Sequence, residues 1–376
     1  MAAIGWEFDS VYNFNENTSA YTNNTLEAQS PAGTSFTLFN STADYLLLGH
    51  SQKFDMAIFD VDTAGSLGAL TWQYSTGSSW VTFVPASGRF ATDPDDDEGA
   101  QYDFSSDGAE IFPANLLSDW AKREFTIDGV AVSKYWIRIN AASTASAPTI
   151  KRIQCRPIAI YTTSKNVFEL LQLKNVTGTT DFDDTTIPTK ETVDFYINEA
   201  QAYIDMNTRK SWRPNYVVEA YLEFNLNGFK LEYPNPQKII DLKIWNGANW
   251  DSKTQGRTKD YFFVSTTGMI QFARYFLLPA RFTSYNAPVW RWGGGEFTMP
   301  IKVTYLAGRD INTDALQGGI VQEIAKKMAA INVVANSDFG NLAVSGMDRV
   351  SMSEKVNTWQ QEIEDRIDFL TAFEVF

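Results

Sequence analysis

The chain has 376 residues, of which 44% are hydrophobic and 20% charged, so it is long enough for roughly two or three domains and too apolar to be disordered. Its net charge of −14 would repel phosphate backbones, which argues against sequence-reading nucleic-acid binding but allows DNA to slide along an acidic wall. The single cysteine, Cys155, and single histidine, His50, exclude disulfides within the chain, most zinc sites, and Ser-His-Asp or Cys-His catalysis unless both act together.

The N-terminal stretch MAAIGWEFDS has neither the basic region nor the apolar region of a signal peptide. No apolar run approaches the length of a membrane-spanning helix, so we expect no membrane partner. Cys155 is most simply a small buried hydrophobic residue, and His50 is typical of a structural or solvent-facing histidine. We therefore expect no cofactor, no metal ligands and no catalytic residues.

Residues 1–160 are predicted to form an all-β domain. Short apolar runs recur there between clusters of Gly, Pro, Asn, Asp and Ser. This pattern is typical of a β-sandwich of the jelly-roll or immunoglobulin-like kind. The predicted strands are 34–39, 44–48, 54–61, 69–74, 80–84, 134–139 and 150–160.

Two turns flanked by aromatic residues raise the question of sugar binding. Tyr74 and Trp80 lie on either side of one turn, and Trp245 and Trp250 lie on either side of another. A hairpin places such residues on facing strands, where aromatic pairs are common in sandwich cores. We favour two hairpins and keep a glycan contact made by Tyr74 and Trp80 as the alternative.

The acidic stretch DPDDDEG at 93–99 invites comparison with a calcium-binding loop. An EF-hand starting at Asp93 would need Gly at its sixth position and Glu at its twelfth, where this chain has Glu98 and Phe104. The EF-hand is therefore excluded. We favour a solvated loop, with a looser cation site as the alternative.

Residues 161–190 are predicted to be a connector. Their second part, 174–190, is rich in Thr and Asp and contains Pro188, a composition typical of loops. This segment would separate the all-β domain from the rest of the chain.

Residues 191–376 follow a different pattern, in which helices frame a second β portion at about 215–307. Apolar residues at the spacing of one face of an amphipathic helix predict helices at 191–208, 314–334 and 352–373. The predicted fold class is therefore α+β, with an N-terminal sandwich followed by a helical domain that carries a β insertion.

Each predicted helix carries one apolar stripe. The last helix is expected to open with a capping box formed by Ser351 and Glu354. In the helix predicted at 314–334, the Gly318-Gly319 pair weakens the first turns by about 1 kcal/mol per glycine. The stripes are Val193, Ile197, Ala200 and Ile204; Leu316, Ile320, Ile324, Met328 and Ile331; and Val356, Trp359, Ile363, Ile367 and Leu370.

The stretch WRWGGGEF at 290–297 lacks the Lys-Ser/Thr of a phosphate-binding loop and precedes no predicted helix. Its simplest interpretation is a loop tip. Because Trp and Arg are favoured anchors at protein interfaces, Trp290, Arg291 and Trp292 are alternatively a contact point for a neighbouring subunit.

The second half of the chain has a recognisable order of segments: the helix INEAQAYIDMNTRKSW, the run NGFKLEYPNPQKIIDLKIWNG, the strand pair YFFVSTTGMIQF, and IKVTYLAGRDINTDALQGGIVQEIAKK. Over about 190–335 this order resembles the head–tail connector, or adaptor, proteins of tailed bacterial or archaeal viruses. In that family a strand ending in V-T-Y-x-A-G feeds a long helix through a loop that usually holds a proline. The loop 309–314 lacks that proline, and residues 1–160 lie outside the resemblance. The matching residues are Val303, Thr304, Tyr305, Ala307 and Gly308.

The resemblance implies a structural protein of the virion and not an enzyme. Such adaptors join the portal ring to the neck or tail, in a ring of about twelve copies around the DNA channel. The implied partners are the portal protein, other neck or tail proteins, further copies of the chain, and DNA that passes nonspecifically. The implied location is the head–tail junction of the virion, after synthesis in the host cytoplasm. The three helices would build the ring, with the sandwich outside it.

A ring adaptor needs apolar surface that one subunit leaves uncovered. We expect the three stripes and the final segment FLTAFEVF to find too little cover within one subunit, so that adjoining copies or the portal bury them. For the final segment, packing back onto its own core is the alternative. The proposed interface residues are Trp290, Arg291, Trp292, Trp359, Phe369, Leu370, Phe373, Val375 and Phe376.

The main rival interpretation is a baseplate, fibre or adhesin module that holds glycan with its N-terminal sandwich. A polymer-cleaving enzyme is a third and disfavoured class. It would need two carboxylates converging in a groove with the pKa of one of them raised, and the 45 Asp and Glu residues single out no such pair.

Overall fold

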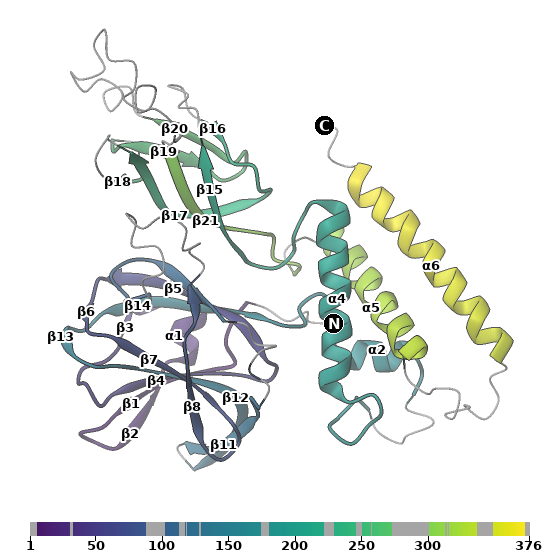
Figure 1. The fold of residues 1–376 in the computed structure, drawn as a ribbon, viewed down its shortest axis with the longest axis horizontal. Coiled ribbons are helices and arrows are strands. Elements are labelled where there is room, and N and C mark those ends of the chain that lie inside the picture. The colour runs from purple at the N-terminus through teal and green to yellow at the C-terminus, as the bar shows by residue number, and fades with distance from the viewer. Residues whose placement is uncertain are drawn as a thin grey trace, which may run out of the picture.

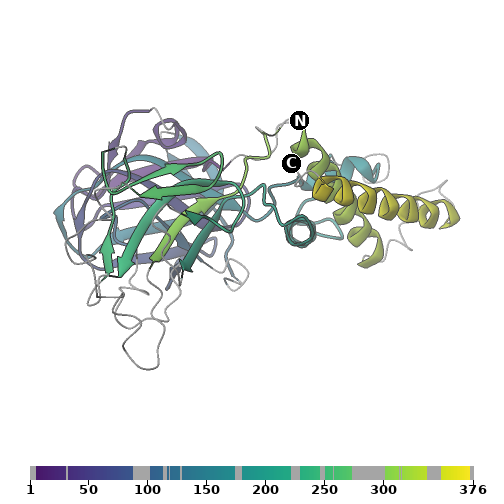
Figure 2. The same cartoon turned by 90° about the horizontal axis from the view of Figure 1, so that it is seen from above.

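The computed structural model describes residues 6–30, 33–87, 102–112, 117, 119–127, 129–173, 180–221, 229–245, 250–256, 258–272, 301–312, 314, 316–336 and 349–372. Over these residues the chain forms two β units and a helical bundle (Figure 1). Seen from above, the β units overlie one another and the bundle stands beside them (Figure 2). This confirms the α+β class. None of the helices in these ranges is both long and apolar enough to span a membrane.

The N-terminal unit consists of short strands and one short helix. They are β1 (Ser10–Asn15), β2 (Ala20–Asn23), α1 (Thr25–Gln29), β3 (Phe36–Thr37), β4 (Tyr45–His50), β5 (Phe54–Thr63), β6 (Ser66–Leu67), β7 (Leu70–Ser75), β8 (Trp80–Phe83), β9 (Ala86–Ser87), β10 (Gly108–Ile111), β11 (Lys122–Ile127), β12 (Val130–Ala141), β13 (Thr144–Ser146) and β14 (Thr149–Pro157).

Within the described part of this unit, two antiparallel sheets form the predicted β-sandwich. One has the order β2-β1-β4-β12-β7-β8, with β11 paired to β12, and the other has the order β3-β14-β5-β10-β9. Aromatic rings fill the space between the sheets. Trp72 is fully buried, and its ring lies 6.4 Å from that of Phe59 and 6.5 Å from that of Phe83, both edge to face. Edge-to-face pairs add to the stabilisation that burial alone provides.

The first part of the expected connector is instead a helix of the bundle, α2 (Ser164–Leu170). Thr163 caps it, since its Oγ1 accepts a hydrogen bond from the backbone N–H of Asn166 at 3.2 Å. Val167 and Phe168 are buried in one of the two apolar clusters of the bundle. A plain connector over 161–190 is therefore wrong, because a capped turn with two apolar residues packs on the other helices.

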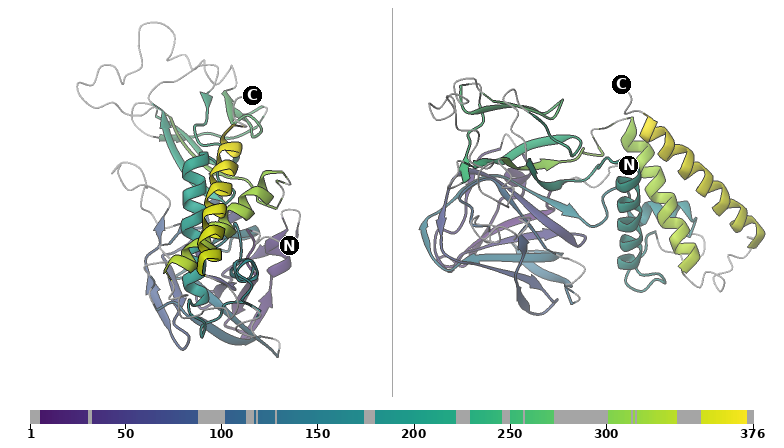
Figure 3. Two further views of the ribbon diagram at one scale, coloured as in Figure 1. Left: turned by 90° about the vertical axis from the view of Figure 1, so that its right-hand side faces the viewer. Right: turned by 45° about the horizontal axis from the view of Figure 1, so that its top comes forward.

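The three predicted long helices are confirmed as α4 (Lys190–Thr208), α5 (Gln317–Asn336) and α6 (Arg349–Ala372). Figure 3 shows α6 on the side of the bundle away from the β units. Since α6 begins two residues before Ser351, Ser351 does not open the helix, and the predicted capping box is wrong.

The expectation that the stripes lack cover within one subunit is also wrong for most of their residues. All four stripe residues of α4 are fully buried, and so are Ile324 of α5 and Leu370 of α6. The helices α2, α4, α5 and α6 pack on one another and bury these side chains in two clusters. Leu316, just before α5, is exposed, and four stripe residues are only half-buried: Ile320, Met328, Ile331 and Val356.

A second β unit is inserted between α4 and α5, as predicted. Over the described residues, one of its sheets has the order β15-β21-β17-β18 and the other β16-β20-β19. Both ends of the insertion meet at the bundle, where the backbone N–H of Arg309 donates to the carbonyl of Ser211 at 2.8 Å. The strands are β15 (Asn215–Tyr221), β16 (Phe229–Lys230), β17 (Pro236–Trp245), β18 (Trp250–Ser252), β19 (Tyr261–Val264), β20 (Met269–Phe272) and β21 (Ile301–Ala307).

Gly308 lies at the point where the insertion returns to the bundle. Its φ of +114° is a backbone conformation that favours glycine, and a Cβ there would overlap the carbonyl oxygen of Arg213. A glycine is thus required at the end of the V-T-Y-x-A-G segment, because the chain segments that enter and leave the β insertion approach each other closely there.

Candidate functional site

The proposed interface residues of α6 divide between core and surface. Trp359 and Leu370 belong to the apolar clusters of the bundle, so their assignment to an intermolecular interface is wrong. They are buried because they lie on the inward stripe of the helix. Phe369 is 42% exposed and remains an interface candidate. Trp290, Arg291, Trp292, Phe373, Val375 and Phe376 lie outside the described residues, as does the acidic stretch 93–99.

Helix α4 carries a second apolar face that the sequence analysis missed. Phe195 is 50% exposed, Tyr203 42% and Met206 71%, and Ala202 is exposed beside them. Phe195, Ala202 and Met206 repeat the spacing of the buried stripe with an offset of two residues. Because a helix turns by about 100° per residue, that offset places them on the opposite side of α4. The sequence did contain a signal for this second face, because the apolar spacing of the buried stripe recurs two residues further along the chain.

The two aromatic turns are hairpins. Trp245 and Trp250 are backbone register partners in the antiparallel pair β17–β18, as predicted. Tyr74 points into the sandwich core, where its hydroxyl donates to Asp119 Oδ1 at 2.6 Å. This hydrogen bond and burial raise the pKa of Tyr74 to about 12.

Trp80 lies on the other face of the same sheet, since it pairs with Ser75 and not with Tyr74. There its ring stacks on Phe125 at 6.0 Å, and the Arg138 guanidinium lies 4.6 Å above it. Tyr74 and Trp80 therefore share no surface, and a glycan contact made by the pair is wrong.

His50 and Cys155 are both structural. The pKa of His50 is lowered by burial, although Asp9, whose Oδ1 lies 3.9 Å from Nε2, acts to raise it. Cys155 is fully buried and its Sγ donates to the carbonyl of Glu7 at 3.4 Å. Burial raises the pKa of its thiol and keeps it unreactive. Within the described ranges, no group of three or more His, Cys, Asp or Glu side chains is arranged to hold a metal ion.

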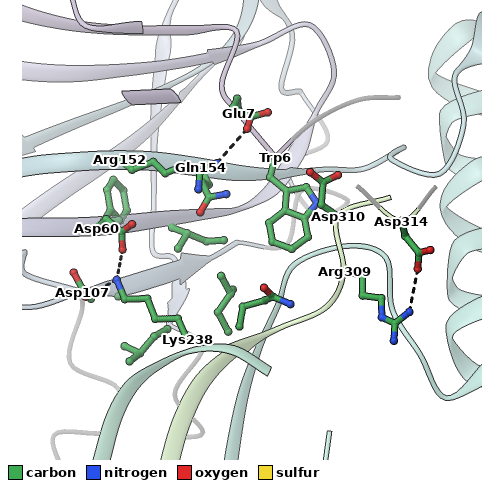
Figure 4. Close-up of a pocket in the computed structure, with 16 residues that line it drawn as sticks. Trp6, Glu7, Asp60, Asp107, Arg152, Gln154, Lys238, Arg309, Asp310 and Asp314 are labelled. Carbon is green, nitrogen blue, oxygen red and sulfur yellow. Dashed lines mark hydrogen bonds and ion pairs between the residues drawn. The ribbon is translucent and has the colours of Figure 1, made fainter. Parts of the chain in front are cut away.

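A cavity of about 610 Å³ lies between the sandwich and the β insertion (Figure 4). Strands β5, β10 and β14 form one wall, and β17, β21 and the segment leading to α5 form the other. Trp6 projects between the two walls (Figure 4). The lining residues are Trp6, Glu7, Ile58, Phe59, Asp60, Asp107, Gly108, Arg152, Gln154, Gln237, Lys238, Ile240, Leu306, Arg309, Asp310 and Asp314.

Lys238 ties the two walls of this cavity together. Its Nζ reaches from β17 to Asp60 and to Asp107 Oδ2, the latter at 2.6 Å (Figure 4). Although burial acts to lower it, hydrogen bonds to Asp107 and Asp60 raise the pKa of Lys238, which keeps the ammonium charged. The joint between the β units is therefore ionic as well as apolar.

A second cavity, of about 440 Å³, lies where the sandwich meets the start of α4. Lys53 pairs with Glu191 there at 2.5 Å. Asp194 lines the same cavity, and among the described residues no hydrogen-bond partner reaches its buried Oδ1. Burial raises the pKa of Asp194 to about 7, although Lys190 acts to lower it. This carboxyl group therefore titrates near neutral pH.

No protein-family model and no curated protein matches the chain. Among solved structures, 39% of this chain aligns with 91% of a chain described as CpGH89CBM32-6 produced by Clostridium perfringens, at 10% sequence identity and a TM-score of 0.23. A similarity at that level carries no argument about fold or function.

Proposed function

We propose that the chain is a head–tail adaptor of a tailed virus, a structural protein that joins the portal ring to the neck or tail around the DNA channel. Two features support this proposal. The β unit is inserted between α4 and α5, which is the order of segments behind the resemblance to adaptors. The net charge of −14 suits a wall along which DNA passes without being held.

The observation that carries the proposal is the second apolar face of α4. A helix that packs on its own bundle with one face and presents Phe195, Tyr203 and Met206 on the other has surface for a further molecule. In the adaptor ring, that molecule is the adjoining copy of the chain. A heterologous contact of this kind closes into a ring when the repeated rotation from copy to copy returns to the first copy, and otherwise builds an open filament.

Imaging of virus particles that carry a tag on this chain tests the proposal. We expect signal at one unique vertex, and loss of that signal when Phe195→Glu and Met206→Glu are combined, because charges on both sites oppose burial. Phe262→Glu is the matched control, since Phe262 is an exposed aromatic residue of the β insertion. It should leave the vertex signal unchanged. Signal at the distal tail tip or over the whole capsid would overturn the adaptor assignment.

A further inference from the structure

We infer that the outer face of the sandwich docks on the outer face of α6 in a second copy of the chain, with arginines on one side of the contact and carboxylates on the other. This interface is additional to the one proposed on α4 and does not rest on the adaptor role. Three observations lead to it: two guanidiniums among aromatic rings, an acidic helix face, and the position of both faces at opposite ends of the molecule.

Aromatic rings lie on the outer face of the sheet that contains β4, β8 and β12. Tyr45, Trp80 and Phe125 are half-buried there, where an antiparallel sheet that faces water usually carries polar residues. This sheet is on the far side of the sandwich from the β insertion, because the insertion packs on the other sheet. Aromatic residues and arginine are enriched at the centres of protein interfaces, and Asp and Glu are depleted.

Two arginines lie among these rings. The guanidinium of Arg138 is 4.6 Å from the centre of the Trp80 ring and 5.3 Å from that of Tyr45. The guanidinium of Arg123 is 5.3 Å from the same Trp80 ring and 5.0 Å from that of Phe125. Attraction between a cation and a ring face orients each guanidinium. Because both lie beside one ring, two positive charges are held close together on this face.

Neither of these guanidiniums pairs with a carboxylate of the described residues. Arg138 donates from Nε and Nη2 to the uncharged Oε1 of Gln73, and its Nη1 has no described partner and is reached by solvent. In a chain with a net charge of −14, this face favours a partner that supplies carboxylates. Four other arginines do form ion pairs with carboxylates: Arg152, Arg156, Arg213 and Arg309.

The outer face of α6 offers such carboxylates. Glu364, Asp365 and Asp368 are exposed, and their spacing places them on one side of the helix. Within the described part of the chain, none of the three forms an ion pair, and every exposed charged residue of α6 is acidic. Phe369 lies beside them and is 42% exposed, so it adds an apolar contact. A convex helix with this pattern is complementary to the flat outer sheet of the sandwich.

The two faces cannot meet within one molecule. Figure 2 shows the sandwich at one end and α6 at the other. A contact between them therefore joins two copies and leaves one face of each kind unused at the ends of the pair. Such a heterologous contact adds further copies, in a ring if the rotation closes and in a filament if it does not.

Sedimentation velocity of the full-length protein, over a series of protein concentrations at low and high salt, tests the inference. We expect reversible association at low salt that weakens at high salt, because salt screens the charges. Arg138→Glu and Asp365→Arg should each weaken association about tenfold, since each places like charges opposite one another. Asp365 is on an exposed helix face, so its variant maintains the test if Arg138→Glu fails to fold.

Mixing the two variants is the decisive measurement. Association should return in the mixture, because each variant offers the other a face of opposite charge. Lys165→Glu and Glu169→Arg are the matched controls, since they make the same changes of charge at exposed positions of α2. Each control should associate as the unmodified protein does. Near-UV circular dichroism establishes that every variant is folded.

Three results would overturn the inference. One is a protein that stays monomeric at every concentration and salt level. Another is association that Arg138→Glu or Asp365→Arg, once folded, leaves unchanged. The last is a mixture of the two variants that does not associate although each alone has lost association. Association that only the combined Phe195→Glu and Met206→Glu changes remove would contradict this interface and support the contact proposed on α4.

Discussion

The sandwich and the helical bundle bury their apolar side chains in different ways. The sandwich buries most of its apolar side chains in one large core dominated by aromatic rings, such as Phe59, Trp72 and Phe112, and adds a small cluster that contains Leu47 and Trp136. The bundle divides its apolar residues between two smaller clusters that follow one another along α4. The bundle also leaves Phe195, Tyr203 and Met206 exposed on one helix, α4, whereas the exposed large apolar residues of the sandwich lie in or next to three different elements, α1, β8 and β12: Leu26, Val84 and Val130.

The difference extends to the kinds of residue that make contact. Ala325, Ala329 and Ala330 of α5 are fully buried, and these small side chains let α4 and α5 approach closely. Close packing of small residues buries less area per residue than packing of large rings, so each contact of the bundle contributes less to stability. Four changes test how far this contrast holds, from the largest expected effect to the smallest.

Trp72→Ala should have the largest effect, because it leaves a cavity in the middle of the sandwich. Trp72 is fully buried among Phe59, Phe83 and Phe112. We expect a loss of about 3–5 kcal/mol in the free energy of unfolding, measured by chemical denaturation and near-UV circular dichroism. A loss below about 1 kcal/mol would mean that the core is not continuous.

Ile363→Ala should cost less, at about 2–4 kcal/mol, and should act locally. Ile363 is buried against the bundle on α6, the outermost helix (Figure 3). We expect faster proteolysis of α6 with an unchanged near-UV signal from the sandwich. If the sandwich unfolds together with α6, the two regions form one cooperative unit and the contrast fails.

Asp194→Asn should stabilise the protein in a pH-dependent way. The folded state keeps Asp194 protonated up to about pH 7, because burial raises its pKa, whereas the unfolded carboxyl loses its proton near its usual value of 3.8. The free energy of unfolding of the unmodified protein therefore falls as pH rises between these values, and this loss is complete above pH 7.

The expected gain in thermal unfolding measurements is small at pH 4 and grows to about 1–3 kcal/mol at pH 8. Asp184→Asn is the control, since Asp184 lines the same cavity but is exposed. Its effect should stay within about 0.5 kcal/mol at both pH values. A pH-independent gain for Asp194→Asn would contradict a buried, titrating carboxyl group.

Phe195→Glu and Met206→Glu should have the smallest effect on the single chain. Both side chains point away from the bundle, so we expect the free energy of unfolding to change by less than about 0.5 kcal/mol. Equilibrium denaturation of the isolated protein measures this change. A loss of several kcal/mol would mean that the face is covered within one chain, and would remove the support it gives to assembly.

Hydrophobic spacing in the sequence was sufficient to predict the long helices and most central strands. Strands such as β4, β5 and β14 are apolar on their inward face, and the stripe of α4 is regular over four turns. Strands β1 and β10 were missed because SVYNFN and GAEI mix polar and small residues. Helix α2 was missed because it is short, although the Thr163 cap was a usable signal.

The sites were less accessible to sequence reasoning. The faces of Tyr74 and Trp80 depend on strand register, and a shift of one residue reverses the face. The interdomain cavity gathers residues from Trp6 to Asp314, and no local pattern brings such distant positions together. Buried polar groups without partners are likewise visible only once the packing is known.

The return of the β insertion to the bundle has a mechanical consequence. Its outgoing and incoming segments lie side by side, joined by the hydrogen bond from Arg309 to Ser211, with Gly308 allowing their close approach. The sandwich, in contrast, is linked covalently to the bundle by the single stretch between β14 and α2. A pull or twist applied to the helices is thus shared by two adjacent, antiparallel chain segments at the insertion and carried by one chain segment at the sandwich. The insertion is therefore tied to the helices by two chain segments, and the sandwich by one segment together with its ion pairs to the insertion and the Lys53–Glu191 pair at α4.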